Sequence, residues 1–276
     1  MENKKTFFAN LEPKSALIVG VVTGILVLCT IGFIVMTVVY FGGKSDGKSA
    51  TTKAKTSGNA GTTVTATVTK SAKPKAELFI MSYCPYGLQM AKAYLPVMTL
   101  LKDKADLSIN FVNYAMHGKK EIDENSREYC IQSEQKDKFV NYMTCFTAKD
   151  DYSACLSSAG VNTSKLDVCA SQLDTKYSIT KKYNDQSTWL SGKYPVYPVQ
   201  NDLNKKYNVQ GSPTLIINGT EVSANRTPEA VKKAICDSFT TAPSECQKTL
   251  STVSAVSGFG TATATGADTT GAECES

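Results

Sequence analysis

The stretch from residue 15 to residue 43 carries no charged side chain, and residues 16–41 within it are almost wholly Ala, Val, Ile, Leu, Met, Phe, Gly and Thr. At 1.5 Å per residue, residues 16–41 would form a helix of about 39 Å, enough to cross a hydrocarbon core of about 30 Å with some tilt. A cleavable signal peptide has a shorter apolar segment of about 7 to 15 residues. We therefore expect a transmembrane helix over residues 16–41.

The segments on either side of the expected folded domain have a different composition. Residues 42–75 are rich in Thr, Lys, Gly and Ser and contain no aromatic residue, Leu or Ile, so they cannot bury enough surface to offset the entropy of ordering. We expect a flexible linker there. Residues 250–276 are again rich in Thr, Ala, Gly and Ser, which predicts a disordered tail. A folded domain is left for residues 76–249.

The orientation in the membrane is inferred from the cysteines. Lysines flank the apolar segment on both sides, so the excess of positive charge does not fix the direction. The chain has nine cysteines, and paired cysteines are typical of oxidising compartments outside the cytoplasm. We expect residues 1–15 to be cytoplasmic, the following helix to contact membrane lipid and the folded domain to be extracytoplasmic.

The net charge of +5 does not indicate a nucleic-acid-binding domain. Most of the positive charge comes from seven lysines in the linker, and the folded segment 76–249 is close to neutral. A basic patch or stripe on the folded part is the usual sign of binding to nucleic acid. We therefore expect no nucleic-acid partner.

The folded segment alternates between strand-like and helix-like patterns. Apolar runs over residues 76–82 and 106–114 predict two strands, and apolar residues at helical spacing between them predict a helix and hence a parallel βαβ unit. Residues from about 117 to 183 look helical. Residues 214–223 contain the turn dipeptide Asn218-Gly219 between short apolar runs, which predicts a hairpin, and Pro228 begins a last helix. The pattern predicts an α/β fold with an all-helical insertion.

Cys84 is the strongest candidate for a reactive side chain. It follows the first expected strand directly and precedes Pro85, Tyr86 and Gly87. The unpaired N–H groups and the dipole at a helix start stabilise a thiolate, which is the nucleophilic form of cysteine. Proline is favoured at the first helical position because it has no N–H to leave unsatisfied. The other interpretation is that Cys84 is a small buried residue with no chemical role.

A second feature lies far along the chain, where Ser212 and Pro213 precede the expected hairpin. A proline there cannot donate a ladder hydrogen bond, so it must occupy a turn, an edge or a cis peptide. Together with Cys84 at the end of the first strand, this pattern resembles the thioredoxin fold, in which a cis-proline loop lies against the active-site cysteine. The resemblance covers about residues 76–239. The long helical insertion makes the chain similar to the periplasmic disulfide oxidoreductases.

A third motif narrows the resemblance. The segment from Ala115 to Cys130 is similar to the signature CQHGxxECxxNxxxxC of the gamma-interferon-inducible lysosomal thiol reductases, with His117, Gly118, Glu121, Asn125 and Cys130 in register. Ala115 and Ile122 stand where that family has cysteines. His117 is the only histidine, and the two interpretations open for it are a catalytic base and a loop residue that hydrogen-bonds the turn. We expect Glu121, Asp123 and Glu124 to form the solvated first turn of a helix.

Gly87 departs from the pattern of a dithiol enzyme. Such an enzyme has a second cysteine three residues after the first, which resolves the mixed disulfide. With glycine in that position, the mixed disulfide on Cys84 needs an outside thiol, such as a small molecule, the client's own cysteine or a membrane redox partner. The resemblance therefore implies a single-thiol reductase or isomerase acting on disulfide-containing client proteins. The alternative is a thioredoxin-like binding or chaperone module without turnover.

The remaining cysteines predict disulfides. With Cys29 in the membrane segment and Cys274 in the tail set aside, six cysteines besides Cys84 can pair, and these six allow 15 connectivities. Spacing favours Cys236 with Cys246, and we expect Cys145 with Cys155 and Cys130 with Cys169. The other interpretation is that some of them are buried thiols. No spacing of Cys and His predicts a metal site, and we expect no cofactor.

Overall fold

The computed structural model describes residues 68–261, and the structural statements below concern this part of the chain. The expected transmembrane helix over residues 16–41 lies outside the described residues, as do the start of the linker and residues 262–276. Within the described part, no helix is both long and apolar enough to cross a bilayer.

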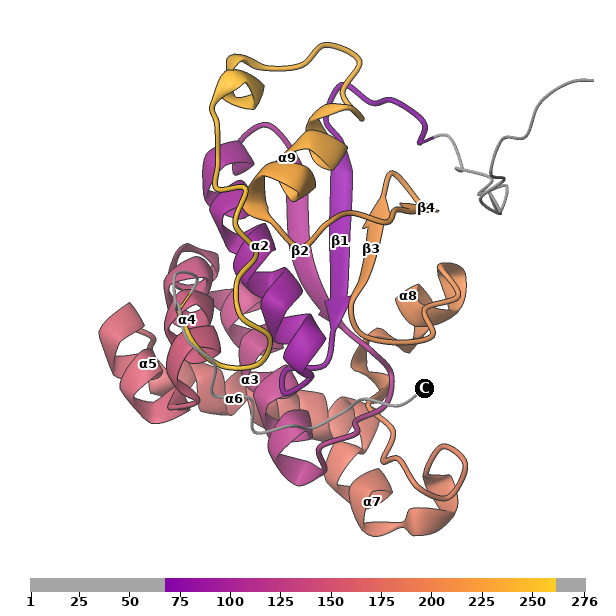
Figure 1. Ribbon diagram of the computed structural model, residues 1–276. Coiled ribbons are helices and arrows are strands. Elements are labelled where there is room, and N and C mark those ends of the chain that lie inside the picture. The colour runs from indigo at the N-terminus through magenta and orange to yellow at the C-terminus, as the bar shows by residue number, and fades with distance from the viewer. Residues whose placement is uncertain (1–67, 262–276) are drawn as a thin grey trace, which may run out of the picture. The chain divides into compact units, whose positions relative to one another are not determined.

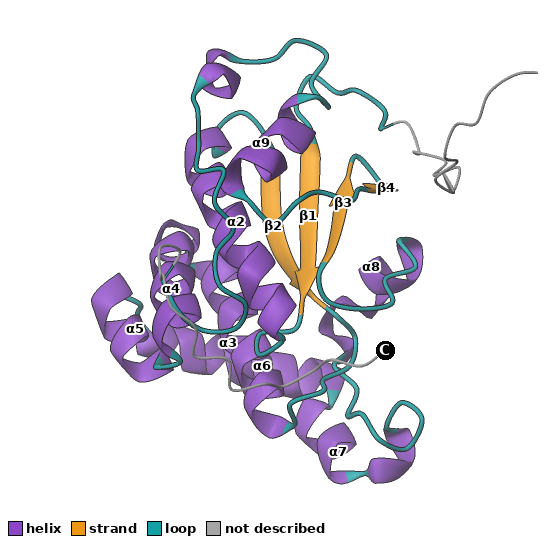
Figure 2. Ribbon diagram, viewed as in Figure 1, coloured by secondary structure: helices purple, strands orange, loops and turns teal. Residues whose placement is uncertain are grey.

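A four-stranded sheet with the strand order β2-β1-β3-β4 organises the fold (Figures 1 and 2). The strands are β1 (Lys75–Ile80), β2 (Asp106–Phe111), β3 (Thr214–Ile217) and β4 (Thr220–Glu221). β1 runs parallel to β2, with Leu78 opposite Ile109, and antiparallel to β3. All residues of β1 except the first are buried, which explains why Leu78, Phe79 and Ile80 form an apolar run rather than alternating with polar residues.

The predicted βαβ unit and hairpin are confirmed. Helix α2 (Pro85–Leu101) connects β1 to β2 and packs against α9 (Pro228–Cys236), which lies beside it in Figure 1. Asn218 and Gly219 have φ angles of 48° and 84°, the left-handed backbone that a two-residue hairpin turn requires. Asn218 also accepts a hydrogen bond from the N–H of Lys75 at 2.8 Å, so the turn is attached to the start of β1.

The connection from β2 to β3 is helical, close to the predicted range of 117–183. It contains α3 (Lys119–Glu134), α4 (Lys136–Lys149), α5 (Tyr152–Ala159), α6 (Thr163–Tyr177) and α7 (Ile179–Asn184), then the short helices η2 (Gln186–Thr188), η3 (Pro198–Gln200) and α8 (Asn201–Lys206). A last short helix, η4 (Ser244–Gln247), follows α9. Because α4 packs against α2, the insertion shares its buried core with the sheet domain.

The end of the expected linker is ordered, which corrects the boundary at residue 75. The N–H of Ser71 donates to the carbonyl of Ser238 at 2.9 Å, and the N–H of Thr240 donates to the carbonyl of Ser71 at 2.9 Å. These two hydrogen bonds pair residue 71 with the segment after α9. Backbone pairing does not depend on the side-chain type, so composition could not locate this boundary.

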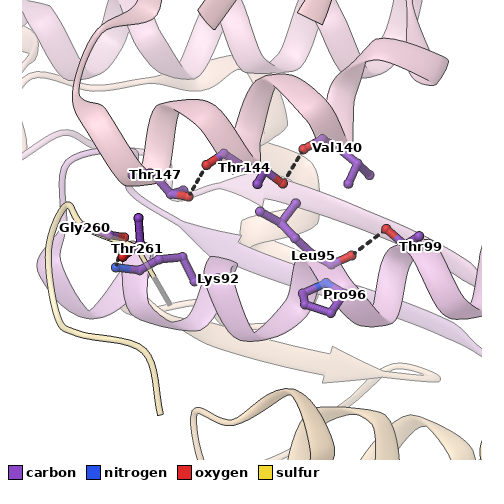
Figure 3. Close-up of a pocket in the computed structure, with 10 residues that line it drawn as sticks. Lys92, Leu95, Pro96, Thr99, Val140, Thr144, Thr147, Gly260 and Thr261 are labelled. Atoms are coloured by element: carbon purple, nitrogen blue, oxygen red, sulfur yellow. Dashed lines mark hydrogen bonds between the residues drawn. The ribbon is translucent and has the colours of Figure 1, made fainter. Parts of the chain in front are cut away.

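The start of the expected disordered tail is also ordered, and the prediction is wrong for residues 250–261. We call this segment the C-terminal strap. Its Gly258 N–H donates to the carbonyl of Pro85 at 2.9 Å, and the Lys92 ammonium group donates to the carbonyls of Gly258 and Gly260 at 2.7 and 3.1 Å. Figure 3 shows the end of the strap beside Lys92, at a groove between α2 and α4. The strap is therefore held to α2 by hydrogen bonds of its own backbone.

Phe259 is the strap residue with the largest expected effect on stability. Its ring packs edge-to-face on Tyr83 and Phe146, with centroid distances of 5.6 and 5.4 Å. We expect Phe259→Ala to lower the free energy of unfolding by about 2 kcal/mol, measured by urea denaturation. Val253→Ala is the matched control in the same segment, because Val253 is 66% exposed and its change should have almost no effect. Equal losses for both variants would show that Phe259 does not anchor the strap.

Candidate active site

Cys84 lies where β1 ends and α2 begins. It is the N-cap residue of α2, with φ −68° and ψ 123°, and Pro85 follows at the first helical position. Its N–H donates to the carbonyl of Met81 at 3.0 Å, and its own carbonyl accepts the first helical hydrogen bond from Leu88 at 2.8 Å. Cys84 is not part of a disulfide and is only 1% exposed. The sulfur therefore lies at the positive end of the helix dipole.

The Ser212–Pro213 peptide bond, 128 residues away, lies against this sulfur and is cis. The Sγ of Cys84 is 3.6 Å from the carbonyl oxygen of Ser212 and donates toward it. The hydroxyl of Ser212 accepts a hydrogen bond from the N–H of Met81 at 2.9 Å, which attaches the loop to the end of β1. The sheet has the order β2-β1-β3-β4, a cysteine lies at the start of the first helix, and a cis-proline precedes the third strand, as the resemblance to the thioredoxin fold implied for the cysteine and the proline. The domain has a thioredoxin-like fold.

The other residues near the cysteine differ in exposure. Tyr86 is 46% exposed, and the guanidinium carbon of Arg226 lies 4.8 Å from the centroid of its ring. Gly87 is buried in the first turn of α2. The ring of His117 contacts Glu121 and Tyr83, with Nδ1 2.9 Å from a carboxylate oxygen of Glu121. The structure therefore places Pro85, Tyr86, Gly87, Ser212 and Pro213 around Cys84, and His117 on the neighbouring turn.

Glu121 fixes the backbone that leads into Cys84. Its side chain is fully buried, so the expectation of a solvated first turn is wrong for this residue. One carboxylate oxygen accepts from the N–H of Tyr83 at 3.0 Å, and the other accepts from the N–H groups of Met116 and His117 at 2.7 and 3.1 Å. A buried carboxylate is stable here because it satisfies three backbone donors at once.

Asn125 continues this support one turn further along α3. Its side-chain oxygen accepts from both the N–H and the hydroxyl of Ser82, at 3.2 and 2.6 Å. Gly118, the N-cap of α3, has a φ of 70°, which favours glycine. Cys130 is bonded to Cys169 at the far end of the helix. The motif residues from His117 to Cys130 thus hold the turn before Cys84 and join α3 to α6.

Two further carboxyl groups of α3 are buried, those of Glu124 and Glu128, and for Glu124 the expectation of a solvated turn is wrong. Glu124 accepts from the hydroxyl of Tyr142 at 2.6 Å and pairs with Arg127. Neither oxygen of Glu128 has a hydrogen-bond partner of normal geometry among the described residues. Burial and the neighbouring Glu124 raise the pKa of Glu128 well above its usual range, and burial also raises the pKa of Glu124.

The raised pKa of Glu128 predicts a pH-dependent cost to stability. The folded protein binds this proton more tightly than the unfolded chain. The stabilisation that comes from protonating Glu128 is therefore fully present below the unfolded pKa of about 4.3. It falls as pH rises toward the folded pKa, by up to about 1.4 kcal/mol per pH unit. We expect Glu128→Gln to melt at a higher temperature than the wild type at about pH 7.5 and at a similar temperature near pH 4.

The control for this variant is Glu134→Gln, which changes an exposed carboxyl group of the same helix. Its melting temperature should follow the wild type at both pH values. If Glu128→Gln melts below the wild type at about pH 7.5, then the folded protein needs the Glu128 carboxylate, and the expected rise in melting temperature is wrong.

Three disulfides are present in the described residues. They join Cys130 with Cys169, Cys145 with Cys155, and Cys236 with Cys246, the pairs that the sequence analysis expected. The first joins α3 to α6, the second joins α4 to α5, and the third joins the end of α9 to η4. The residues described contain no cluster of three or more His, Cys, Asp or Glu side chains that could hold a metal ion.

Comparison with known proteins gives likenesses of structure rather than of sequence. No family model matches the sequence, and no curated protein matches it either. Reduced DsbA from Mycobacterium tuberculosis is 18% identical with a TM-score of 0.42, over 65% of this chain and 94% of that one. Oxidised BdbD from Bacillus subtilis is 17% identical with a TM-score of 0.42, over 66% and 92%. MdbA, a thiol-disulfide oxidoreductase from Actinomyces oris, is 11% identical with a TM-score of 0.42, over 62% and 84%.

Proposed function

We propose that this chain is a thiol-disulfide oxidoreductase that reduces or isomerises client disulfides through the single thiol of Cys84. The observation that carries the proposal is the position of the Cys84 sulfur, at the N-cap of α2 and 3.6 Å from the carbonyl oxygen of Ser212. The apolar segment 16–41 and the paired cysteines support a domain tethered to a membrane on its extracytoplasmic side.

The first step is attack by the Cys84 thiolate on one sulfur of a client disulfide. A new bond forms between Cys84 and that sulfur, the client S–S bond breaks, and the other client sulfur leaves as a thiolate that takes up a proton. The N-terminal dipole of α2 stabilises the attacking thiolate. The loop at Pro213 offers backbone groups to an extended client segment beside the sulfur.

The second step differs between reduction and isomerisation. In reduction, a thiolate from a small molecule or a membrane redox partner attacks the mixed disulfide, and a second thiol completes the exchange. Two donor thiols are oxidised to one disulfide while the client disulfide becomes two thiols. In isomerisation, another thiol of the client attacks, which releases Cys84 and forms a different client disulfide with no net change in oxidation state.

One observation favours the alternative of a binding module without turnover. Cys84 is only 1% exposed, and thiol exchange requires that a client sulfur reach it. Under this alternative the loop at Pro213 holds a client segment while the thiol stays unreactive. The two functions differ in whether Cys84 forms a covalent bond with a disulfide compound at neutral pH.

The test is to trap the mixed disulfide on the full chain. After incubation with oxidised glutathione at neutral pH, we expect mass spectrometry of unreduced peptides to find glutathione on Cys84. The adduct should persist because residue 87 carries no resolving thiol, and it should disappear when dithiothreitol is added. Cys274→Ser is the matched control and should give the same adduct. If Cys84 stays unmodified while Cys274 reacts, the binding module is the correct function.

A further inference from the structure

Gly87 lies in a space that accepts no side chain. A Cβ atom added there would lie 2.5 Å from the hydroxyl oxygen of Ser212, 3.1 Å from the carbonyl oxygen of Met81 and 3.3 Å from the Cβ of Cys84. The last two contacts are tight but need shifts of only a few tenths of an ångström. The first is far inside van der Waals contact. The Ser212 hydroxyl is therefore the group that decides what position 87 can hold.

The Ser212 hydroxyl is not able to move aside without cost. It accepts the hydrogen bond of the Met81 N–H at 2.9 Å, and Met81 is only 1% exposed. Rotating the side chain would leave a buried N–H without its acceptor, which is one of the costlier losses in a protein interior. The carbonyl of the same residue faces the Cys84 sulfur at 3.6 Å. Ser212 is thus held in contact with both the end of β1 and the reactive cysteine.

We propose that Ser212 is the residue that restricts this protein to single-thiol chemistry, because its hydroxyl fills the space that a second thiol at position 87 would need. This inference rests on the proposed function. It implies that the mixed disulfide on Cys84 is resolved by a thiol from outside the domain, and that restoring a cysteine at position 87 is not sufficient to make a dithiol enzyme. Ser212 would be a specificity-determining residue rather than a nucleophile.

The experiment compares three variants of the full chain: Gly87→Cys, Gly87→Cys with Ser212→Ala, and Gly87→Cys with Ser212→Thr. Each is reduced, freed of reductant and exposed to oxidised glutathione. Forming a disulfide between residues 84 and 87 removes two thiol hydrogens and converts one oxidised glutathione to two reduced ones. Mass spectrometry of unreduced peptides measures the fraction of each variant that contains this internal disulfide.

We expect the variant with Ser212→Ala to contain about tenfold more internal disulfide than the other two, since removing one overpacked atom typically shifts an equilibrium by that order. The threonine variant is the control because it keeps a hydroxyl at residue 212. Equal disulfide in Gly87→Cys and in its Ser212→Ala partner would overturn the proposal. Absence of the disulfide from all three would also overturn it, because another group would then exclude the second thiol.

A second measurement covers the case in which Gly87→Cys does not fold. Gly87→Ala adds only the Cβ atom, so we expect it to lower the melting temperature when Ser212 is present and to have a smaller effect when Ser212→Ala is also made. Equal effects in both backgrounds would contradict the proposal. Neither measurement depends on turnover. The role of Ser212 could therefore be confirmed even if the protein has no reductase activity, and it could be excluded even if the protein is an active reductase.

Discussion

The Cys84→Ser variant is expected to lose its activity: with glutathione present, it should reduce the disulfides of insulin at no more than about one thousandth of the wild-type rate. A serine hydroxyl does not exchange with disulfides, because the reaction needs a sulfur nucleophile that can form and release an S–S bond. The substitution is nearly isosteric at a position that is 1% exposed, and the hydroxyl can still donate toward the carbonyl of Ser212. The loss should therefore come from chemistry rather than from unfolding.

The matched controls are Cys29→Ser and Cys274→Ser, the two other cysteines that lie outside the three disulfides. Both should keep the wild-type rate. The melting temperature of Cys84→Ser should also remain close to that of the wild type. A Cys84→Ser protein that is folded and retains its activity would show that another thiol carries the reaction, and the assignment of Cys84 as the nucleophile would then be wrong.

The parts of the fold that could be predicted are those with local physical signals. A cysteine followed by proline after an apolar strand predicts a helix start, and Cys84 is the N-cap of α2. Asn218-Gly219 has one favoured turn conformation, and it has positive φ at both residues. A proline at position 213, just before a strand, was compatible with a turn, an edge strand or a cis peptide, and the structure has the cis peptide. Each of these features depends on residues within a few positions of one another.

The parts that could not be predicted depend on partners far along the chain. Glu121 is buried because its hydrogen-bond donors include the N–H of Tyr83, 38 residues earlier. Charged residues on a helix are usually solvated, so composition gave the opposite expectation. The signal that could have located it is its register in the motif with His117, Gly118 and Asn125. The C-terminal strap gave no such signal, since most of its hydrogen bonds use backbone groups that every residue carries, and a single aromatic residue, Phe259, supplies its ring contacts.

Under the proposed function, the residues that react differ from those that position them. Cys84 and the loop of Ser212 and Pro213 form the surface where exchange takes place under the proposed function. Beneath it, Glu121 and Asn125 on α3 hold Tyr83 and Ser82, the two residues that precede the cysteine. The helical insertion therefore supports the turn before Cys84 as well as extending the fold. Substitutions of Glu121 or Asn125 should therefore affect the reactivity of Cys84, although neither residue would contact a client.

Glu121→Ala is expected to destabilise the protein by about 3 kcal/mol or more, because it leaves three backbone N–H groups near Cys84 without their acceptor. Urea denaturation measures this loss. Glu121→Gln should lower the stability by less, since its carbonyl oxygen can still accept a hydrogen bond. It should not match the wild type, because its amide N–H groups cannot accept from the remaining backbone donors. Where the alanine protein remains folded, alkylation of its Cys84 should differ in rate from the wild type, because the turn that fixes the sulfur has lost its support.

Asp123→Ala provides the matched control on the same helix. Asp123 is 47% exposed at its side chain and pairs with Lys119 on the surface, and such pairs contribute about 0 to 1 kcal/mol. The two acidic residues are two positions apart, so the difference between the stability losses of their alanine variants reports on the buried hydrogen bonds that only Glu121 accepts. If both alanine variants lost the same small amount of stability, the buried carboxylate would not be supporting the turn. The motif from His117 to Cys130 would then need a role other than positioning Cys84.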